Sequence, residues 1–462
     1  MVKRLFGSTG IRGITFGNVI SPENVVFIPE NVIKFAKIFA EINKSKEFLV
    51  GRDPRISSPM FEAAVIVGLT SKGKDVCLTD VVPVPAINYN CKIEQKPGIM
   101  ITGSHTPQKQ NAIKFILPNG AEIDFKTGEK EIEDRFFDGN YGTYANPMEC
   151  GQVSRRNILP AYFKYLEKYL NPEAKRLKIV IDPGNGCWSG VMKNFLVDQG
   201  IQVEAINDFP DGTFPGRGPE PDDQSLEKLA MKVREFNADL GVGYDADGDR
   251  AICCDEKGTF IWGDYLLALL AGKIVKKGET IATAVSTAGV IEDVAEEGGF
   301  DIHWTSVGAA EVTRIALENG YPLAGEQNGG VIFPTDNPCR DGGRTTVELL
   351  NLLAEEDKVL SELMEKLPRY YIEKEKIAHD PKLLAERPKI IEAVLEEFKH
   401  LNPDTIDGVK IKFNIEANIS SLLRFSNTEP IFRVYSNGKD ESLVKKEHKE
   451  CAQKIREILS QF

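Results

Sequence analysis

The chain has 462 residues, of which 42% are hydrophobic and 27% charged, with a formal net charge of -12. This length exceeds one hydrophobic core and suggests about three domains. The composition is that of a soluble globular protein. The net negative charge disfavours general nucleic-acid binding. An anionic substrate would need a local basic pocket that works against the overall field. No apolar run approaches the roughly 20 residues that span a bilayer, so no membrane association is expected.

The eight cysteines are scattered along the sequence, and none forms a C-x-x-C pair. A zinc ribbon or a thioredoxin-like motif is therefore disfavoured, and reduced thiols in a cytosolic protein are the simplest account. The first residues lack the apolar core of a signal peptide. We expect a cytoplasmic protein.

One pattern occurs three times along the chain: a strand, a loop of small residues, a helix, glycine and a second strand. The predicted strand, helix and strand span 46–50, 58–71 and 75–78 in the first copy, 178–181, 189–198 and 201–206 in the second, and 280–285, 290–297 and 300–304 in the third. Each copy is a predicted βαβ unit whose helix ends at glycine. The pattern favours three α/β domains of similar design, with ordinary α/β repetition as the alternative.

The C-terminal part has a different pattern. Helix-rich sequence over 380–399 is followed by alternating, strand-like sequence over 408–417, 421–425 and 431–435, and by an amphipathic stretch over 441–459. This pattern predicts a fourth, smaller α+β domain, with a hinge near residues 369–376. The predicted domains are 1–152, 153–256, 257–370 and 371–462.

A short acidic loop, Asp245-Ala246-Asp247-Gly248-Asp249-Arg250, follows an apolar run. Alternate side chains of an extended backbone share a face, so Asp245, Asp247 and Asp249 can converge on one hard cation. Arg250 adds a planar donor fork suited to a phosphate beside that metal. A merely solvated acidic loop is the alternative. A calcium loop is disfavoured because Arg250 replaces the required glycine and a strand leads into the loop.

A second polar loop, Thr102-Gly103-Ser104-His105-Thr106-Pro107, also follows an apolar strand. Serine beside histidine suggests a nucleophile and a base, although neighbours in an extended chain point apart. The loop has no G-x-S-x-G elbow, which disfavours an ordinary hydrolase triad. A phosphorylated Ser104 could instead supply a further hard ligand to the metal of the aspartate loop.

Three further loops carry polar side chains. Gly7-Ser8-Thr9-Gly10-Ile11-Arg12-Gly13 suits phosphate, Gly325-Glu326-Gln327-Asn328-Gly329-Gly330 suits sugar hydroxyls, and Arg424-Phe425-Ser426-Asn427-Thr428-Glu429-Pro430 with Arg433 suits phosphate. Each loop read alone could be a surface turn. Together the loops indicate phosphoryl transfer on a phosphosugar.

These loops, in this order, resemble those of the α-D-phosphohexomutase superfamily of phosphoglucomutases, phosphomannomutases and phosphoglucosamine mutases. The resemblance covers the whole chain and includes residues 51–55 (Gly-Arg-Asp-Pro-Arg) and Asp341-Gly342. It implies three similar α/β domains with mixed sheets and a smaller C-terminal α+β domain around a central cleft.

The resemblance also implies roles for individual residues. Ser104 would carry the transferred phosphoryl group, and its phosphate, with Asp245, Asp247 and Asp249, would hold one Mg²⁺. Arg250 would position the transferring group. Lys114, Arg12 and His105 would transfer protons or contact phosphate, and a lysine that acts as a base would need a lowered pKa. The substrate would be bound by Gly308, Glu326, Asn328, Arg424, Ser426, Asn427, Thr428 and Arg433.

Four positions depart from the family pattern. Asn328 stands where many relatives have serine, Gly330 where many have histidine, Asn427 where glycine is commoner, and Ala112 where glycine is usual. The first two lie in the loop that selects the sugar. Gln327 favours a phosphoglucosamine mutase, but the Asn-Gly-Gly ending does not.

The sequence thus predicts a Mg²⁺-dependent phosphohexomutase that interconverts 1- and 6-phosphates of glucose or mannose through a hexose 1,6-bisphosphate. Alternatives of the same chemistry are a phosphoglucosamine mutase and a phosphopentomutase. Alternatives of other classes are a catalytically silent sugar-phosphate-binding relative and a metal-dependent phosphatase. The expected partner is a small phosphosugar, and the oligomeric state is left open.

Overall fold

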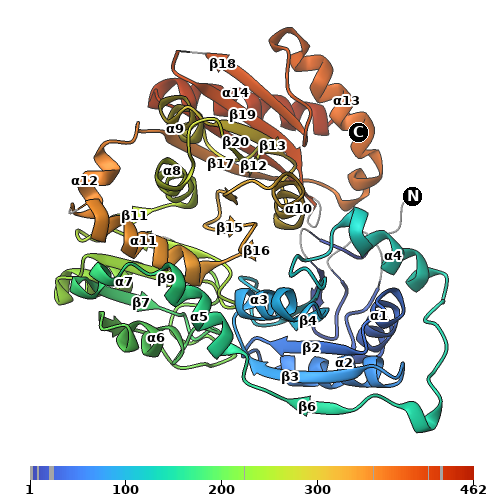
Figure 1. Cartoon of the computed structure of the whole chain (residues 1–462). Helices are drawn as coiled ribbons and strands as arrows, with labels where there is room; N and C mark the ends of the chain where they lie inside the picture. The colour runs from blue at the N-terminus through green and yellow to red at the C-terminus, as the bar shows by residue number, and fades with distance from the viewer. Residues whose placement is uncertain are drawn as a thin grey trace.

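A computed structural model of the chain describes residues 4–7, 10–19, 25–222, 224–356, 358–414, 416–426 and 430–462. The chain forms four units in sequence order, each built on one sheet (Figure 1). The first unit lies at the lower right of the view, the second at the lower left, and the third and fourth above them. Three α/β units with mixed sheets and an antiparallel C-terminal unit confirm the predicted fold class.

The first sheet has the strand order β1-β5-β4-β2-β3-β6. Its strands are β1 (Ile11–Ile14), β2 (Glu47–Arg52), β3 (Asp75–Val81), β4 (Gly98–Ile101), β5 (Gln110–Ile116) and β6 (Val153–Arg155). The helices of this unit are α1 (Pro29–Ile42), α2 (Ser58–Thr70), α3 (Val84–Glu94) and α4 (Lys130–Phe137), with a π-helical turn at Phe125–Glu129 and a 3₁₀ turn at Pro147–Glu149.

The second and third sheets have the orders β11-β10-β9-β7-β8 and β13-β12-β14-β15-β16. The second unit contains α5 (Leu159–Tyr169), a 3₁₀ turn (Pro172–Arg176), β7 (Lys178–Asp182), α6 (Met192–Asp198), β8 (Gln202–Ala205), α7 (Glu227–Phe236), β9 (Leu240–Tyr244), β10 (Ala251–Cys254) and β11 (Phe260–Ile261). The third contains α8 (Gly263–Ile274), β12 (Thr280–Ala284), α9 (Val290–Gly298), β13 (Asp301–Thr305), α10 (Ala309–Asn319), β14 (Ala324–Gly325), β15 (Val331–Phe333), β16 (Asn337–Arg340), α11 (Gly342–Glu356) and α12 (Leu360–Glu365).

The same four-strand arrangement recurs in these three sheets. In the first, β2 pairs in parallel with β3 on one side and β4 on the other, and β5 runs antiparallel to β4. Strands β7, β8, β9 and β10 repeat this arrangement, and so do β12, β13, β14 and β15. The three predicted βαβ copies are therefore confirmed, and they extend to a shared hairpin between the third and fourth strands of each unit.

The fourth unit is an antiparallel sheet of order β17-β20-β19-β18 covered by helices. It comprises β17 (Tyr371–Ala378), a 3₁₀ turn (Pro381–Glu386), α13 (Arg387–Phe398), a 3₁₀ turn (Lys399–Leu401), β18 (Val409–Asn414), β19 (Ile419–Phe425), β20 (Ile431–Gly438) and α14 (Glu441–Leu459). The predicted hinge over 369–376 remains a prediction, but most of that segment is the edge strand β17, paired with β20 along its whole length, so only residues 369 and 370 precede the fourth sheet.

The predicted domain limits remain a prediction, and two strands bear on them. β6 lies beyond the predicted limit at residue 152 but pairs with β3 of the first sheet. β11 lies beyond the limit at residue 256 but pairs with β10 of the second.

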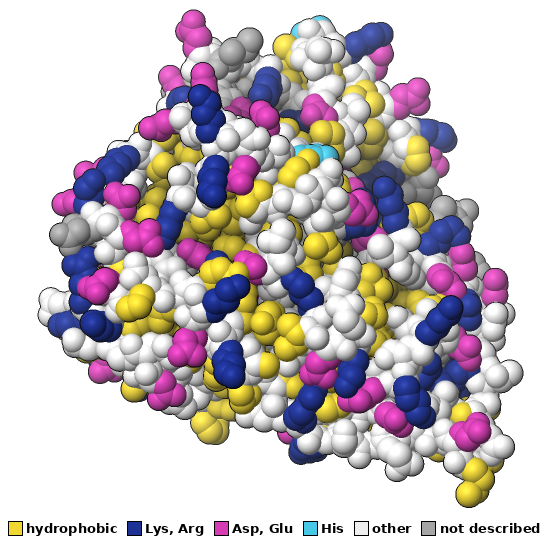
Figure 2. Space-filling model, in the orientation of Figure 1, with side chains coloured by type: hydrophobic (Ala, Val, Ile, Leu, Met, Phe, Trp, Pro, Cys, Tyr) yellow, Lys and Arg dark blue, Asp and Glu magenta, His cyan; other side chains and the backbone are white. Residues whose placement is uncertain are grey.

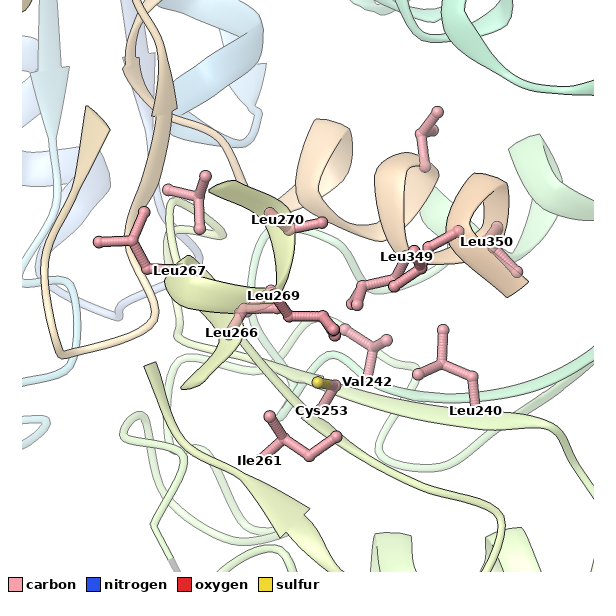
Figure 3. Close-up of a cluster of buried hydrophobic side chains, with 14 of the residues drawn as sticks. Leu240, Val242, Cys253, Ile261, Leu266, Leu267, Leu269, Leu270, Leu349 and Leu350 are labelled. Atoms are coloured by element: carbon pink, nitrogen blue, oxygen red, sulfur yellow. The ribbon is translucent and has the colours of Figure 1, made fainter. Parts of the chain in front are cut away.

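The second and third units share one hydrophobic core (Figure 3). Helix α8 carries leucines around its circumference, as expected of a helix buried on all sides. Leu266 and Leu270 of α8 and Leu349 of α11 pack with Val242 of β9 in this core, and all four are fully buried. Each such side chain stabilises the packing by about 1.5–3 kcal/mol relative to exposure. This shared core therefore fixes the β9–β10 hairpin of the second unit relative to the β14–β15 hairpin of the third.

The fourth unit returns to contact the first. A pocket of about 350 Å³ is lined by Arg4 and Glu129 of the first unit, Gly308 of the third, and Arg387 and Asp407 of the fourth. On the face shown in Figure 2, acidic and basic side chains are interspersed. Within the described ranges, no helix combines the length and the apolar character needed to cross a bilayer.

Candidate active site

The polar loops identified in the sequence occupy equivalent places in the fold. The Ser104 loop joins β4 to β5, the aspartate loop joins β9 to β10, and the Glu326 loop joins β14 to β15. Each is thus the hairpin between the third and fourth strands of its unit. The segment that starts at Ser426 likewise joins the antiparallel strands β19 and β20. The repeated topology therefore presents one polar hairpin from each of the first three units.

Asp245, Asp247 and Asp249 converge as predicted, and the structure buries all three. One carboxylate oxygen from each lies within 4.8 Å of the others. Gly248 between them has φ +74°, and a Cβ there would lie 2.3 Å from Trp188 Nε1. The indole also donates to the Gly248 carbonyl at 2.9 Å. The turn therefore requires glycine, and the loop is packed rather than a solvated acidic surface.

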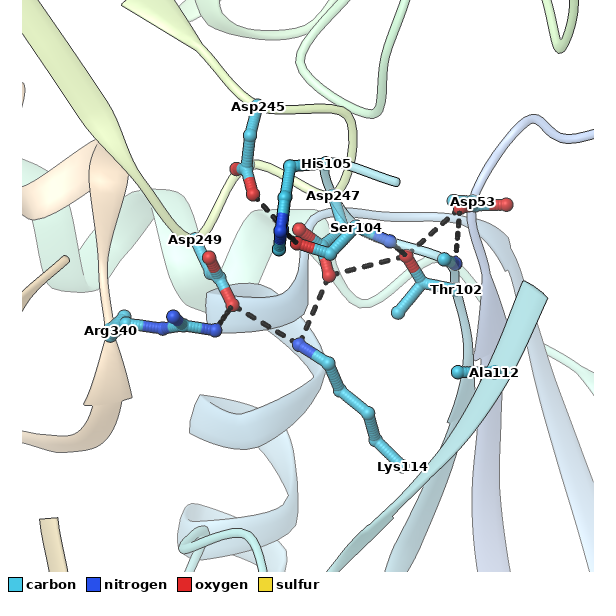
Figure 4. Close-up of polar contacts among 12 residues, drawn as sticks. Asp53, Thr102, Ser104, His105, Ala112, Lys114, Asp245, Asp247, Asp249 and Arg340 are labelled. Atoms are coloured by element: carbon cyan, nitrogen blue, oxygen red, sulfur yellow. Dashed lines mark hydrogen bonds and ion pairs between the residues drawn. The ribbon is translucent and has the colours of Figure 1, made fainter. Parts of the chain in front are cut away.

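Figure 4 shows the contacts that link these carboxylates to Ser104, Lys114 and Arg340. Asp247 Oδ2 and Asp249 Oδ2 each accept a hydrogen bond from Lys114 Nζ at 3.1 Å. Their Oδ1 atoms accept no hydrogen bond from any described residue, although Arg250 Nε lies 3.9 Å from Asp249 Oδ1. Buried carboxylate oxygens without donors fit a hard divalent cation. This cluster could therefore bind a metal.

The three carboxylates differ in their electrostatic surroundings. Burial, together with the charges of Asp247 and Asp249, raises the pKa of Asp245 well above its ordinary value. Burial also opposes ionisation of Asp249, but Arg340, Lys114 and Arg250 outweigh it and hold the pKa of Asp249 below its ordinary value. A cation that joined the cluster would relieve the repulsion that Asp245 experiences.

Ser104 of the first unit meets this cluster directly. Its Oγ donates to Asp245 Oδ2 at 2.8 Å, and both side chains are buried. Ser104 has φ +49°, so the loop is not extended there, and His105 Nδ1 lies 3.3 Å from Ser104 Oγ. The expectation that these neighbours point apart is therefore wrong, because it assumed extended backbone. Burial and the charges of Arg250 and Arg12 hold the pKa of His105 well below its ordinary value, which favours neutral imidazole.

A buried arginine, Arg55, braces the Ser104 loop. Its guanidinium donates to the carbonyl oxygens of Ser104 at 2.5 Å and Thr106 at 2.6 Å, and to those of two further residues of the segment, Pro107 and Gln110. Asp53 accepts from Arg55 Nε at 2.9 Å and from Thr102 Oγ1 at 2.9 Å. The sequence drew attention to residues 51–55 but gave Arg55 no role, because its partners lie about fifty residues away along the chain.

Three predicted basic residues surround the cluster. Lys114 is buried on β5, and although burial alone would lower its pKa, Asp247, Glu122 and Asp249 raise it above the ordinary value. Lys114 is therefore an ammonium in this arrangement and not a neutral base. Arg12 on β1 has its pKa lowered to about 10 by burial and by the charge of Arg250. Arg250 Nε lies 3.8 Å from Asp245 Oδ2.

The Glu326 loop reaches the aspartates through an arginine that the sequence did not single out. Arg340 Nη2 donates to Asp249 Oδ2 at 2.6 Å, and Arg340 Nη1 lies 3.7 Å from Glu326 Oε2. Asn328 Oδ1 accepts from the Gly330 amide at 3.1 Å. The nearest signal in the sequence was the Asp341-Gly342 pair, which follows Arg340 directly.

Of the remaining predicted residues that the structure describes, Arg424 is linked to the third unit through Asp407. Arg424 and Arg433 are cross-strand neighbours on β19 and β20. Asp407 Oδ2 accepts from the Val307 amide at 3.0 Å and pairs with Arg424 Nη2 at 3.0 Å, which ties the turn before Gly308 to this arginine. Ser426 is buried at the end of β19. Asn427 and Thr428 lie outside the described residues.

Family models match the first three units of the chain, and known proteins match nearly its whole length. The models described as phosphoglucomutase/phosphomannomutase α/β/α domains I, II and III match residues 3–142, 160–258 and 262–371. A phosphoglucomutase/phosphomannomutase of Thermococcus kodakarensis is 35% identical over 451 residues, which is 95% of either chain. A phosphoglucosamine/phosphogalactosamine mutase of Sulfurisphaera tokodaii is 35% identical over 460 residues, which is 96% of either chain.

Solved structures share the fold. A phosphoglucomutase/phosphomannomutase family protein from Burkholderia thailandensis superposes with a TM-score of 0.83 at 22% identity, covering 99% of this chain and 98% of its own. From the loops, the repeated topology and these matches we conclude that the chain belongs to the phosphoglucomutase/phosphomannomutase family of the α-D-phosphohexomutase superfamily and is an intramolecular phosphotransferase.

Proposed function

We propose that this enzyme interconverts 1- and 6-phosphates of glucose and mannose, with Ser104 as the phosphoryl carrier and a hexose 1,6-bisphosphate as the intermediate. The observation that supports this most strongly is the hydrogen bond from Ser104 Oγ to Asp245 Oδ2 at 2.8 Å. It brings a hydroxyl from one hairpin into a carboxylate cluster of another. A phosphoryl group on that oxygen would lie beside Asp245, in the cluster that also contains Asp247 and Asp249.

The transfer exchanges one phosphate ester for another. The bond between phosphorus and Ser104 Oγ breaks as a bond to a sugar hydroxyl oxygen forms. The sugar hydroxyl loses a proton and Ser104 Oγ gains one, so the step needs a group that accepts the first proton and returns one to the serine oxygen. His105 is a candidate, since its imidazole is held neutral and lies beside Ser104 Oγ. After the bisphosphate reorients, the other phosphoryl group returns to Ser104, and the same groups act in reverse.

The charges around the cluster suit this chemistry. Asp245, Asp247 and Asp249, with the Ser104 phosphate, would hold Mg²⁺, which when bound neutralises charge on a transferring phosphoryl group. Lys114 holds Asp247 and Asp249 in place as an ammonium. Arg12 and Arg250 supply guanidinium donors for the phosphoryl oxygens.

The substrate would lie between the Glu326 loop and the fourth unit. Glu326 and Asn328, with the Gly308 turn, would bind sugar hydroxyls. Arg424, Ser426, Asn427, Thr428 and Arg433 would grip the phosphate that is not reacting.

Phosphoglucosamine is the second candidate substrate, because relatives of similar identity carry that name. They include the Sulfurisphaera tokodaii protein at 35% and a phosphoglucosamine mutase of Caldicellulosiruptor bescii at 33% identity. The test is a coupled assay of glucose, mannose and glucosamine 1-phosphates, each with and without the hexose 1,6-bisphosphate. We expect turnover of glucose and mannose phosphates. Turnover of glucosamine phosphate alone would mean that the enzyme is a phosphoglucosamine mutase. No turnover of any of the three would refute the proposal.

Intact-mass measurement tests the role of Ser104 separately. The wild-type chain should accept one phosphoryl group from the hexose bisphosphate, and Ser104→Ala should accept none. Ser154→Ala on the exposed strand β6 is the matched control and should behave as wild type. Equal phosphorylation of Ser104→Ala and wild type would remove Ser104 from its proposed role.

A further inference from the structure

Arg340 is a buried arginine that joins two of the hairpins. It is the last residue of β16, its side chain is 5% exposed, and it contacts a carboxylate on each side. Asp249 on the second unit accepts from Nη2 at 2.6 Å, and Glu326 on the third lies 3.7 Å from Nη1. Figure 4 shows the guanidinium directed at Asp249, opposite Lys114. The planar guanidinium reaches the two carboxylates through different terminal nitrogens, Nη2 toward Asp249 and Nη1 toward Glu326.

The stem of Arg340 occupies space that a side chain at position 330 would otherwise take. A Cβ built on Gly330 would lie 2.2 Å from Arg340 Cδ and 2.8 Å from Arg340 Cγ. Gly330 does not lie in the left-handed region, so its backbone alone would accept another residue. Any side chain at position 330 would therefore have to displace the stem of Arg340.

The contact with Arg340 also determines which oxygen of Asp249 is available. Asp249 Oδ2 accepts hydrogen bonds from Arg340 Nη2 at 2.6 Å and from Lys114 Nζ at 3.1 Å. Oδ1 accepts no hydrogen bond from the described residues. Two cations on one oxygen thus orient the carboxylate with its other oxygen toward Asp245 and Asp247. Groups that orient ligands in this way typically change metal affinity or activity by 10–100-fold when they are altered.

We propose that Arg340 is a positioning residue that presents Asp249 Oδ1 to the metal and at the same time fixes Glu326 for the sugar. This inference rests on the proposed function, since it assigns a task within the same site. Metal binding and sugar binding would share one side chain, so displacing that side chain should weaken both.

Two substitutions that preserve net charge test this. Arg340→Lys keeps the cation but cannot span Asp249 and Glu326, and Gly330→Ala keeps the arginine but displaces its stem. Gly272→Ala is the control, because a Cβ at this exposed glycine of α8 meets only Val294 at 3.4 Å. The measurements are the Kd for Mn²⁺ by calorimetry on the full chain, and kcat and KM for the sugar phosphate across a metal titration.

We expect both site variants to bind Mn²⁺ about tenfold more weakly than wild type. Their KM for sugar phosphate should rise by a similar factor, and excess metal should restore kcat but not KM. Variants that melt at lower temperature yet keep Kd and KM within about twofold of wild type would overturn the inference. A wild-type chain that binds no Mn²⁺ would instead refute the metal site itself, and this outcome distinguishes the two failures.

Discussion

The junction at Ser104 and the junction between the third and fourth units are built in opposite ways. At the first, Ser104, Lys114 and the aspartates contact one another with side chains at most 1% exposed. At the second, Lys412 pairs with Glu292 at 3.2 Å and Lys439 with Asp293 at 2.8 Å, and these lysines are 55% and 37% exposed. Breaking the exposed ion pairs costs little free energy because water solvates both charges, whereas breaking the buried contacts leaves unsolvated charges. The proposed phosphoryl-transfer centre is therefore preformed. At the second junction these surface ion pairs contribute little, and the units are also joined by buried contacts such as the hydrogen bond from the Gly289 amide to Asn437 Oδ1 at 2.9 Å.

The largest expected effect follows from removing the cation of the buried junction. Lys114→Met would leave Asp247 and Asp249 without their shared ammonium, and unpaired buried charges cost about 3–5 kcal/mol. We expect that loss in the free energy of unfolding, measured by urea titration in the absence of divalent ions. Added Mg²⁺ should return part of it, because a ligand that binds only the folded chain stabilises it. Equal stability of the variant and wild type would contradict the contrast between the junctions.

A smaller effect is expected from Arg55→Lys. Lysine cannot reproduce the fork that binds the carbonyls of Ser104, Thr106, Pro107 and Gln110, so some of these groups would lose their donor. We expect a loss of about 2–3 kcal/mol in unfolding free energy and at least a tenfold lower kcat, with the sugar-phosphate KM little changed. Arg156→Lys, at an exposed pair with Glu94, is the control and should change neither quantity. A normal kcat in the Arg55 variant would show that the loop holds its shape unaided.

The pocket where the first unit meets the third and fourth should respond to pH. Burial raises the pKa of Glu129 from 4.5 to about 8, so the folded chain holds a proton there that the unfolded chain has lost. Stability from this group is fully present below about pH 4.5 and is lost as pH rises through about 8. Glu129→Gln should abolish this fall, a difference of about 4 kcal/mol by pH 8. Parallel stability curves for the two proteins between pH 5 and 8 would contradict the assignment.

The smallest effect is expected at the exposed junction. Lys412→Met removes only a solvated ion pair with Glu292, and such pairs contribute at most about 1 kcal/mol. Unfolding free energy should change by less than that, and the difference should vanish at high salt. A loss as large as that of Lys114→Met would mean that the two junctions do not differ as described.

Most of the fold could be predicted from the sequence because its signals are local. Apolar runs such as residues 240–244 are central strands, and the glycines after the helices lie where helices end. Strand β17 escaped prediction because its alternating Glu and Lys residues lie on an exposed sheet edge, where charge is tolerated. The start of α6 was placed three residues early, since Gly190, with φ +67°, lies ahead of the helix.

The site was predictable where one loop carries the chemistry and not where distant residues meet. The three aspartates sit on one hairpin, so their spacing alone indicated a cluster. Arg340 is 91 residues from Asp249, and nothing near it in the sequence points there. The approach of His105 to Ser104 depends on one left-handed residue, which no composition rule anticipates.

Because the stem of Arg340 packs against Gly330, the loop of residues 325–330 cannot be exchanged freely between relatives. A graft of residues 325–330 that brings any side chain larger than hydrogen at position 330 would collide with the arginine stem. The donor's residue at position 340 must therefore travel with the loop. If residues 325–330 select the sugar as proposed, sugar preference depends on two segments ten residues apart. Exchanging one segment without the other should then lower the activity of the recipient rather than change its preferred sugar.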